Sequence, residues 1–199
     1  MHPPTCLHLP LKQTLLSLAI LVLPSCAART LQSSPIGPEF AKMQDRATQL
    51  LLQKELAARG PQTPLHDVQV AVLPPQFTGT VAGGSSESEI HASIARSVSN
   101  SGIFVPVSRH LIRNAVNASG VSDAQALLGL ADARERFMTV LADNGFIPEY
   151  LVLPEITTMQ ETAKGRVVWR KTTLNLQLAR SDNGVVAHEQ FDSVIQSVK

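Results

Sequence analysis

Cys26 is the residue whose surroundings are chemically most distinctive. It follows a run of apolar residues, Leu15–Leu23, after the short link Pro24-Ser25. As a helix, about nine residues span only about 14 Å, roughly half of the hydrocarbon core of a bilayer. The run is therefore too short for a membrane span, and it is typical of the apolar core of a signal peptide.

The tetrapeptide Leu23-Pro24-Ser25-Cys26 resembles the lipobox of bacterial lipoproteins. In that family the signal is cut before the cysteine, and the thiol and the new amino group are acylated. Two or more acyl chains give stable membrane anchoring. The resemblance implies lipid attachment at Cys26, and because Ala27 rather than Asp follows it, export to the outer membrane. The alternative is an ordinary signal peptide with a chance cysteine.

The histidines after this segment do not form a metal-binding pattern. None of them makes an H-x-x-x-H pair, and no cysteine of the mature chain stands near them. They are His66, His91, His110 and His188. Zinc sites are typically built from closely spaced His and Cys ligands. We therefore expect no metal site and no cofactor.

Residues for hydrolytic chemistry are present but not arranged for it. Ser85 and Ser86 lack the G-x-S-x-G context of an activated serine, and they are better explained as helix caps. Glu149 and Glu155 can share one face of a strand, but about 20 Å apart, which is too far to act on one bond. The sequence therefore contains no catalytic residues that we can assign, and we expect that the protein is not an enzyme.

A glycine-rich segment, residues 79–86, lies between a predicted strand and a predicted helix, where phosphate-binding loops occur. It lacks the lysine of a P-loop, and Glu87 and Glu89 place negative charge in the first turn of the helix. We interpret residues 76–85 as a loop and Ser86–Glu89 as a capping box, not as a nucleotide site.

Trp169 is the only tryptophan, and three cations surround it: Arg166, Arg170 and Lys171. An aromatic side chain with neighbouring cations is a common composition of interface hot spots. We therefore name these four residues as a candidate partner-binding patch, on an exposed polar sheet edge, together with the loop 76–85. The alternative is that Trp169 packs under the sheet while the cations are solvated.

Charge and cysteine content limit the function classes. Of the 17 Lys and Arg, only Lys12 lies in residues 1–25, which leaves 16 basic against 16 acidic side chains. This balance provides no long-range attraction to nucleic acid or anionic lipid. Cys6 lies in the removed segment, so the domain has no disulfide and depends on a packed core.

Apolar periodicity predicts the elements that position these residues. A helix over 40–59 that ends at Gly60 is amphipathic and is expected to cover the core of its own domain. A strand over 68–72, a helix from the capping box to Gly102, a strand over 104–107 and a helix over 108–120 follow. The next helical region starts after Ser122 and is predicted to break near Gly129.

The last third is predicted to be β-structure: strands over 150–158, 166–179 and 185–195, with a loop over 161–165. Asn183-Gly184 predicts a type I′ hairpin turn. The resulting order of elements predicts an α/β (α+β) fold, a small mixed central sheet flanked by helices, which we expect mainly on one side.

Several segments in this order resemble the LpoB type of outer-membrane lipoprotein, which activates class A penicillin-binding proteins. The matching segments are Val70-Ala-Val-Leu-Pro, Asn100-Ser-Gly-Ile-Phe-Val-Pro-Val-Ser108, Glu149-Tyr-Leu-Val-Leu, Thr173-Leu-Asn-Leu-Gln-Leu and Asn183-Gly-Val-Val. The resemblance covers residues 66–197. The secretion lipoprotein CsgG and the amino-terminal domain of TolB form a wider group with the same core.

This resemblance implies a non-catalytic protein that binds, and activates, a penicillin-binding protein in peptidoglycan synthesis. The alternative is a CsgG-like secretion-accessory or structural lipoprotein that self-assembles at the outer membrane. The expected organisation is a signal peptide (1–25), a tether (26–39), an amphipathic helix with a hinge (40–64) and an αβ domain (65–199). With residues 27–39 and 60–67 fully extended and 40–59 as a helix, the link from the anchor to the domain reaches about 100 Å at most.

Overall fold

The computed structural model describes residues 38–60, 67–79, 85–164 and 166–197. The signal peptide, Cys26, the tether up to residue 37 and residues 61–66 of the hinge region lie outside the described residues. None of the helices in the described ranges combines the length and hydropathy needed to cross a membrane.

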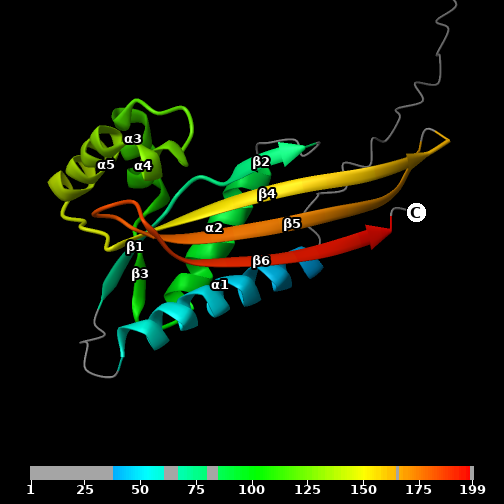
Figure 1. The fold of residues 1–199 in the computed structure, drawn as a ribbon, viewed down its shortest axis with the longest axis horizontal. Coiled ribbons are helices and arrows are strands. Elements are labelled where there is room, and N and C mark those ends of the chain that lie inside the picture. Colours follow the sequence, from blue (N-terminus) through cyan, green and yellow to red (C-terminus); the bar gives the residue numbers. More distant parts are fainter. Residues whose placement is uncertain (1–37, 61–66, 80–84, 165, 198–199) are drawn as a thin grey trace, which may run out of the picture. The chain divides into compact units, whose positions relative to one another are not determined.

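The domain is built on a six-stranded mixed sheet (Figure 1). Its strands are β1 (Val68–Val72), β2 (Gln76–Gly79), β3 (Phe104–Pro106), β4 (Tyr150–Ala163), β5 (Arg166–Arg180) and β6 (Val186–Ser197). The order is β3-β1-β4-β5-β6, and β2 pairs with β4. The pairs among β1 to β4 are parallel, whereas β4, β5 and β6 are antiparallel. The expected α/β (α+β) class is confirmed.

Helices cover both faces of the sheet, not mainly one as expected. On one face lie α1 (Pro38–Arg59) and α2 (Ser85–Asn100); on the other lie α3 (Arg109–Ser119), α4 (Ala126–Gly129) and α5 (Ala131–Asp143). The reason lies in the central strands: Val70 and Val72 belong to the core under α1 and α2, whereas Ala71 and Leu73 belong to the core under α3 to α5. A strand that is apolar on both faces needs a cover on each.

The helix α1 covers the core of its own domain, as its periodicity predicted. Its buried side chains recur every three or four residues and include Phe40, Ala47 and Leu51. They pack in one cluster with Leu174 and Leu176 of β5. The predicted break in the helical region after Ser122 is also confirmed, because α4 ends at Gly129 and α5 begins at Ala131.

Two predicted loops are partly strand. Residues 76–79 form β2 instead of a loop, while residues 80–84 of the same predicted loop lie outside the described residues. β4 continues to Ala163, so residues 161–163 of the loop predicted over 161–165 are strand, while residue 165 lies outside the described residues. Gly79 lies so close to β4 that a Cβ there would stand 2.2 Å from the Thr158 carbonyl oxygen, with φ at 99°. Only glycine permits this approach.

The hairpin between β5 and β6 is confirmed, but its turn is not type I′. That type requires positive φ at both central residues, and of the pair Asn183-Gly184 only Gly184 has one, at 72°. The Gly184 N–H donates to the Arg180 carbonyl, and the Arg180 N–H donates to the Val185 carbonyl, both at 2.9 Å. The turn is therefore wider than the two-residue turn predicted.

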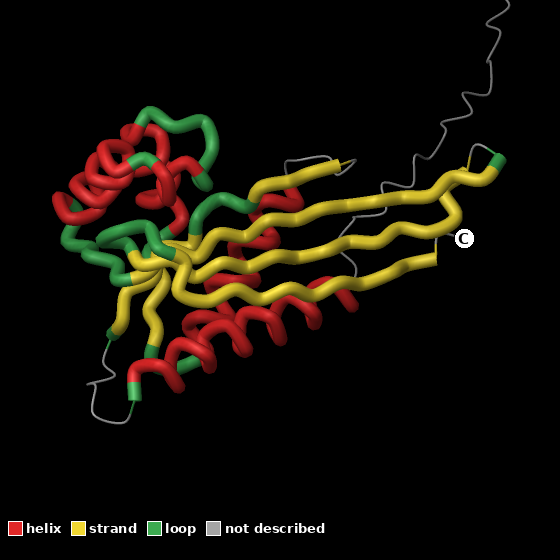
Figure 2. Tube along the Cα trace, in the orientation of Figure 1, coloured by secondary structure: helices red, strands yellow, loops and turns green. Residues whose placement is uncertain are grey.

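The strands β4, β5 and β6 are much longer than the helical layer formed by α3, α4 and α5 (Figures 1 and 2). That layer packs on Ala71 of β1 and, in the long strands, only on the start of β4 and the end of β5, through Leu151, Leu153 and Ala179. Beyond this point one face of the three strands has no helix over it among the described residues.

Candidate interaction surface

The uncovered part of the sheet is the candidate functional surface. Strand register determines which side chains share it, because residues directly opposite each other in an antiparallel pair point to the same face. Met159 pairs with Lys171, and Lys171 pairs with Ile195. We call this surface the open sheet face; it comprises Thr157, Met159, Glu161, Trp169, Lys171, Thr173, Phe191, Ser193 and Ile195.

Large apolar side chains are unusually exposed on the open sheet face. Met159 is 60% exposed, Phe191 59% and Ile195 65%. Two of them flank Lys171 in one row across three strands, and Phe191 lies on the same face two rows away. Apolar side chains gathered on one exposed surface are typical of a protein–protein interaction site.

The structure divides the candidate partner-binding patch between two faces. Trp169 and Lys171 lie on the open sheet face, where the Trp169 indole N–H donates to the Glu161 carboxylate. Arg170 points to the opposite face, because neighbouring residues of a strand alternate, and its Nε is buried without a hydrogen-bond partner among the described residues. Arg166 opens β5 opposite Ala163.

The patch does not lie on a sheet edge. β5 runs between β4 and β6 and is paired with both. The expectation of an exposed edge was wrong because the alternation within a strand shows which face is polar but not where the strand lies in the sheet. A partner would therefore contact Trp169 and Lys171 by packing on the open sheet face, not by pairing with an edge strand.

Sequence reasoning did not find Met159, Phe191 or Ile195. Both faces of β6 mix polar and apolar residues, so its periodicity gives no clear signal. The available signal was the hairpin itself. Once β5 and β6 are paired, Phe191 lies opposite Asn175 and Ile195 lies opposite Lys171, so both point to the same face as Lys171.

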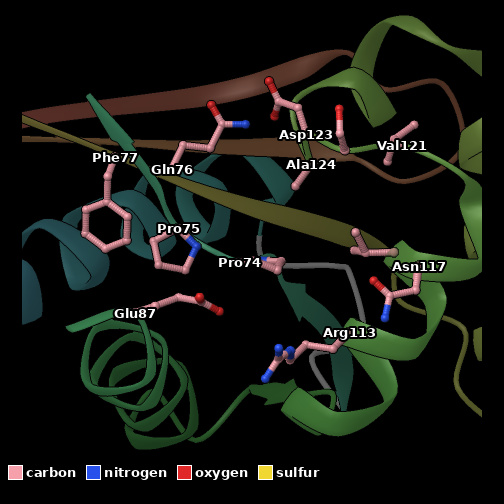
Figure 3. A pocket seen from close by; sticks show the side chains of 12 residues that line it. Pro74, Pro75, Gln76, Phe77, Glu87, Arg113, Asn117, Val121, Asp123 and Ala124 are labelled. Carbon is pink, nitrogen blue, oxygen red and sulfur yellow. The ribbon is translucent and has the colours of Figure 1, made fainter. Parts of the chain in front are cut away.

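A cavity of about 540 Å³ lies elsewhere (Figure 3). It is lined by Pro74 to Phe77, by Glu87 of α2, and by residues of α3 and of the segment that follows it. Glu87 pairs with Arg109 at 3.2 Å, and Asp123 accepts the Gln125 N–H at 2.7 Å. The described lining contains no histidine, cysteine or lysine, and we assign it no catalytic role.

The residues considered for chemistry have structural partners. Glu149 forms an ion pair with Arg59 at 2.6 Å, whereas Glu155 lies near Asn175, 3.4 Å from its amide nitrogen. The two carboxylates therefore serve separate contacts. Within the described part of the chain, no group of three or more His, Cys, Asp or Glu residues is placed to hold a metal ion.

Among the histidines, His91 is buried in α2, with its Nε2 2.9 Å from the Val72 carbonyl oxygen. His188 of β6 lies 3.0 Å from the Glu55 carboxylate, and His110 is exposed on α3 beside Asn114. His66 lies outside the described residues. Each described histidine thus has a different setting, and none of them meets another.

The fold resembles that of LpoB. The NMR structure of LpoB from Escherichia coli superposes with a TM-score of 0.52 at 16% identity, covering 100% of this chain and 86% of that one. The LpoB C-terminal domain from Salmonella enterica gives 0.47 at 19% identity, over 76% of this chain and 97% of the domain. A lipoprotein from Neisseria meningitidis gives 0.46 at 14%, over 65% and 81%.

No protein-family model matches the sequence, and neither does any curated protein. At these identities the likeness to LpoB concerns the fold alone. The expected LpoB-like architecture, a small mixed sheet flanked by helices with a C-terminal hairpin, is confirmed.

Proposed function

We propose that this chain is a non-catalytic outer-membrane lipoprotein whose αβ domain binds and activates a class A penicillin-binding protein. Three observations support the proposal: the LpoB-like fold, the lipobox-like segment ending at Cys26, and the open sheet face. The open sheet face carries the most weight, because a binding protein needs an exposed surface on which apolar anchors and a cation are presented together.

The anchor limits where the partner can be. Because α1 packs into the domain, the segment available as a tether comprises residues 27–37. Fully extended, these residues would reach about 40 Å at most, less than the roughly 100 Å obtained when the helix and hinge are counted as spacers. The proposed partner therefore projects toward the outer membrane.

The first test uses two exposed apolar residues at different places. The full chain with a C-terminal tag is cross-linked in the envelope of its own organism, solubilised and purified. We expect a penicillin-binding protein to be recovered with the wild type. Phe191→Ser should reduce recovery about tenfold, whereas Ile147→Ser, at a residue that is 71% exposed outside the open sheet face, should not.

A second pair of variants tests the orientation of the partner. Lys171→Glu places a negative charge on the open sheet face, whereas Arg170→Glu places it on the opposite face. We expect only Lys171→Glu to reduce recovery and to remove the stimulation of glycan polymerisation by the purified chain. Recovery of no penicillin-binding protein, with no change in polymerisation, would rule out the proposed function.

A further inference from the structure

The outer edge of β6 is a feature that partner binding does not explain. β6 is twelve residues long, is the last strand of the sheet order, and pairs only with β5 among the described strands. It also carries Phe191 and Ile195, both exposed. A long edge strand with exposed apolar residues is a template for pairing with another chain, and proteins commonly protect such edges.

Side chains bind three of the outward main-chain groups in the middle of this edge. In an antiparallel pair, alternate residues point both their N–H and their C=O away from the partner strand. The Glu189 carbonyl accepts from Lys54 Nζ at 2.8 Å, the Phe191 carbonyl accepts from Gln190 Nε2 at 3.1 Å, and the Ser193 N–H donates to Asp192 Oδ1 at 2.9 Å. At each of these three successive outward residues, a side chain thus binds one of the two outward main-chain groups, and we call this side chain a cap.

The caps are themselves held in place by α1. Lys54 also donates to Gln190 Oε1 at 2.9 Å, which orients the amide so that its Nε2 faces the Phe191 carbonyl. Arg46 lies 3.6 Å from Asp192 Oδ2 and leaves Oδ1 for the Ser193 N–H. α1 runs alongside β6 (Figure 1), so one helix supports both ends of the capped stretch.

We propose that Lys54, Gln190 and Asp192 close the outer edge of β6 to strand addition. The partner they exclude is a second copy of this chain, whose β6 would otherwise pair antiparallel with this one. An added strand must take the hydrogen bonds that the three side chains now make. The domain therefore stays unpaired at this edge, and its interactions are directed to the open sheet face.

The test removes the caps without shortening the side chains much. We compare the full chain with the triple variant Lys54→Met, Gln190→Met, Asp192→Leu, in detergent, by light scattering that separates protein mass from detergent mass. The wild type should have the monomer mass, and the triple variant should shift to twice that mass. Hydrogen exchange should show new protection of the Phe191 amide in the dimer.

A matched control adds the same apolar residues at exposed sites without such contacts: Lys42→Met, Gln160→Met, Asp182→Leu. It should remain a monomer. A wild type that is already dimeric with protected β6 amides would overturn the proposal, as would a folded triple variant that stays monomeric.

Single variants at one cap cover the case in which the triple variant does not fold. Asp192→Asn keeps an acceptor oxygen for the Ser193 N–H, whereas Asp192→Leu does not. We expect a rise in mass for the leucine variant only. Equal masses for the two, with both folded, would show that the cap does not control pairing.

Discussion

Glu55 is a buried carboxylate that contacts groups from three elements. It is 3% exposed, accepts from Arg59 at 3.1 Å and from the Tyr150 hydroxyl, and lies 3.0 Å from His188. Burial of Arg59 disfavours its positive charge, but its hydrogen bonds to Glu149, Tyr150 and Glu55 hold the pKa of Arg59 above its usual value. Burial, with the hydrogen bond to Glu55, raises the pKa of Tyr150. The cluster joins α1 to the sheet, where a partner for buried charge is required.

His91 makes the stability of the fold depend on pH. Burial lowers the pKa of His91 below 6.5, and the positive charge of Arg109 acts in the same direction. Since the unfolded chain then binds a proton more readily than the folded one, stability is lost as the pH falls below about 6.5. His91→Gln should flatten this dependence.

The measurement is urea unfolding of the wild type, His91→Gln and His110→Gln at several pH values from about 7.5 to 5. His110 is exposed on α3 and controls for the loss of one imidazole. Parallel pH profiles for the wild type and His91→Gln would show that His91 does not control this dependence.

The turn between β5 and β6 is positioned by the short helix α4 and the start of α5. Arg134 donates to the carbonyls of Leu127 and Leu128, at 2.9 and 3.1 Å, which satisfies carbonyls in the last turn of α4. Gly184 lies against this contact: a Cβ there would stand 2.5 Å from the Leu128 carbonyl oxygen and 2.6 Å from Arg134 Nη1. Tertiary packing therefore explains why glycine is needed at this position.

Gly145 offers a matched comparison, since its φ of 82° is close to the 72° of Gly184 but a Cβ there would meet nothing within 4 Å. Both Gly184→Ala and Gly145→Ala incur backbone strain. We expect Gly184→Ala to lower the free energy of unfolding by about 1–3 kcal/mol more, because only it adds crowding. Urea unfolding of the two variants provides the comparison, and equal losses would contradict the assigned contact.

For the molecule as a whole, the proposed location depends on a single residue. If Cys26 carries the lipid, the wild type should fractionate with the outer membrane, and Cys26→Ser should lose that association. Mass spectrometry of the amino-terminal peptide distinguishes an acylated cysteine from an uncleaved signal peptide. An unmodified Cys26 in a membrane-associated wild type would contradict lipid anchoring, while leaving the interaction surface to be tested separately.

Local sequence patterns were sufficient for most elements of the fold. The spacing of Phe40, Ala47 and Leu51 gave α1 its buried side, Gly129 marked a real break between helices, and Asn183-Gly184 marked a real hairpin. These features depend on residues close together in the chain, so their physical causes can be recognised in a short segment.

The candidate surface depended on contacts between distant segments. Trp169 and Arg170 are neighbours in the sequence but lie on opposite faces, and the open sheet face exists because the α3–α5 layer ends well before β4, β5 and β6 do. The caps on β6 join Lys54 to residues more than a hundred positions away. Periodicity shows which side of an element is apolar, but which element covers that side, and where the cover ends, is decided by packing of the folded chain.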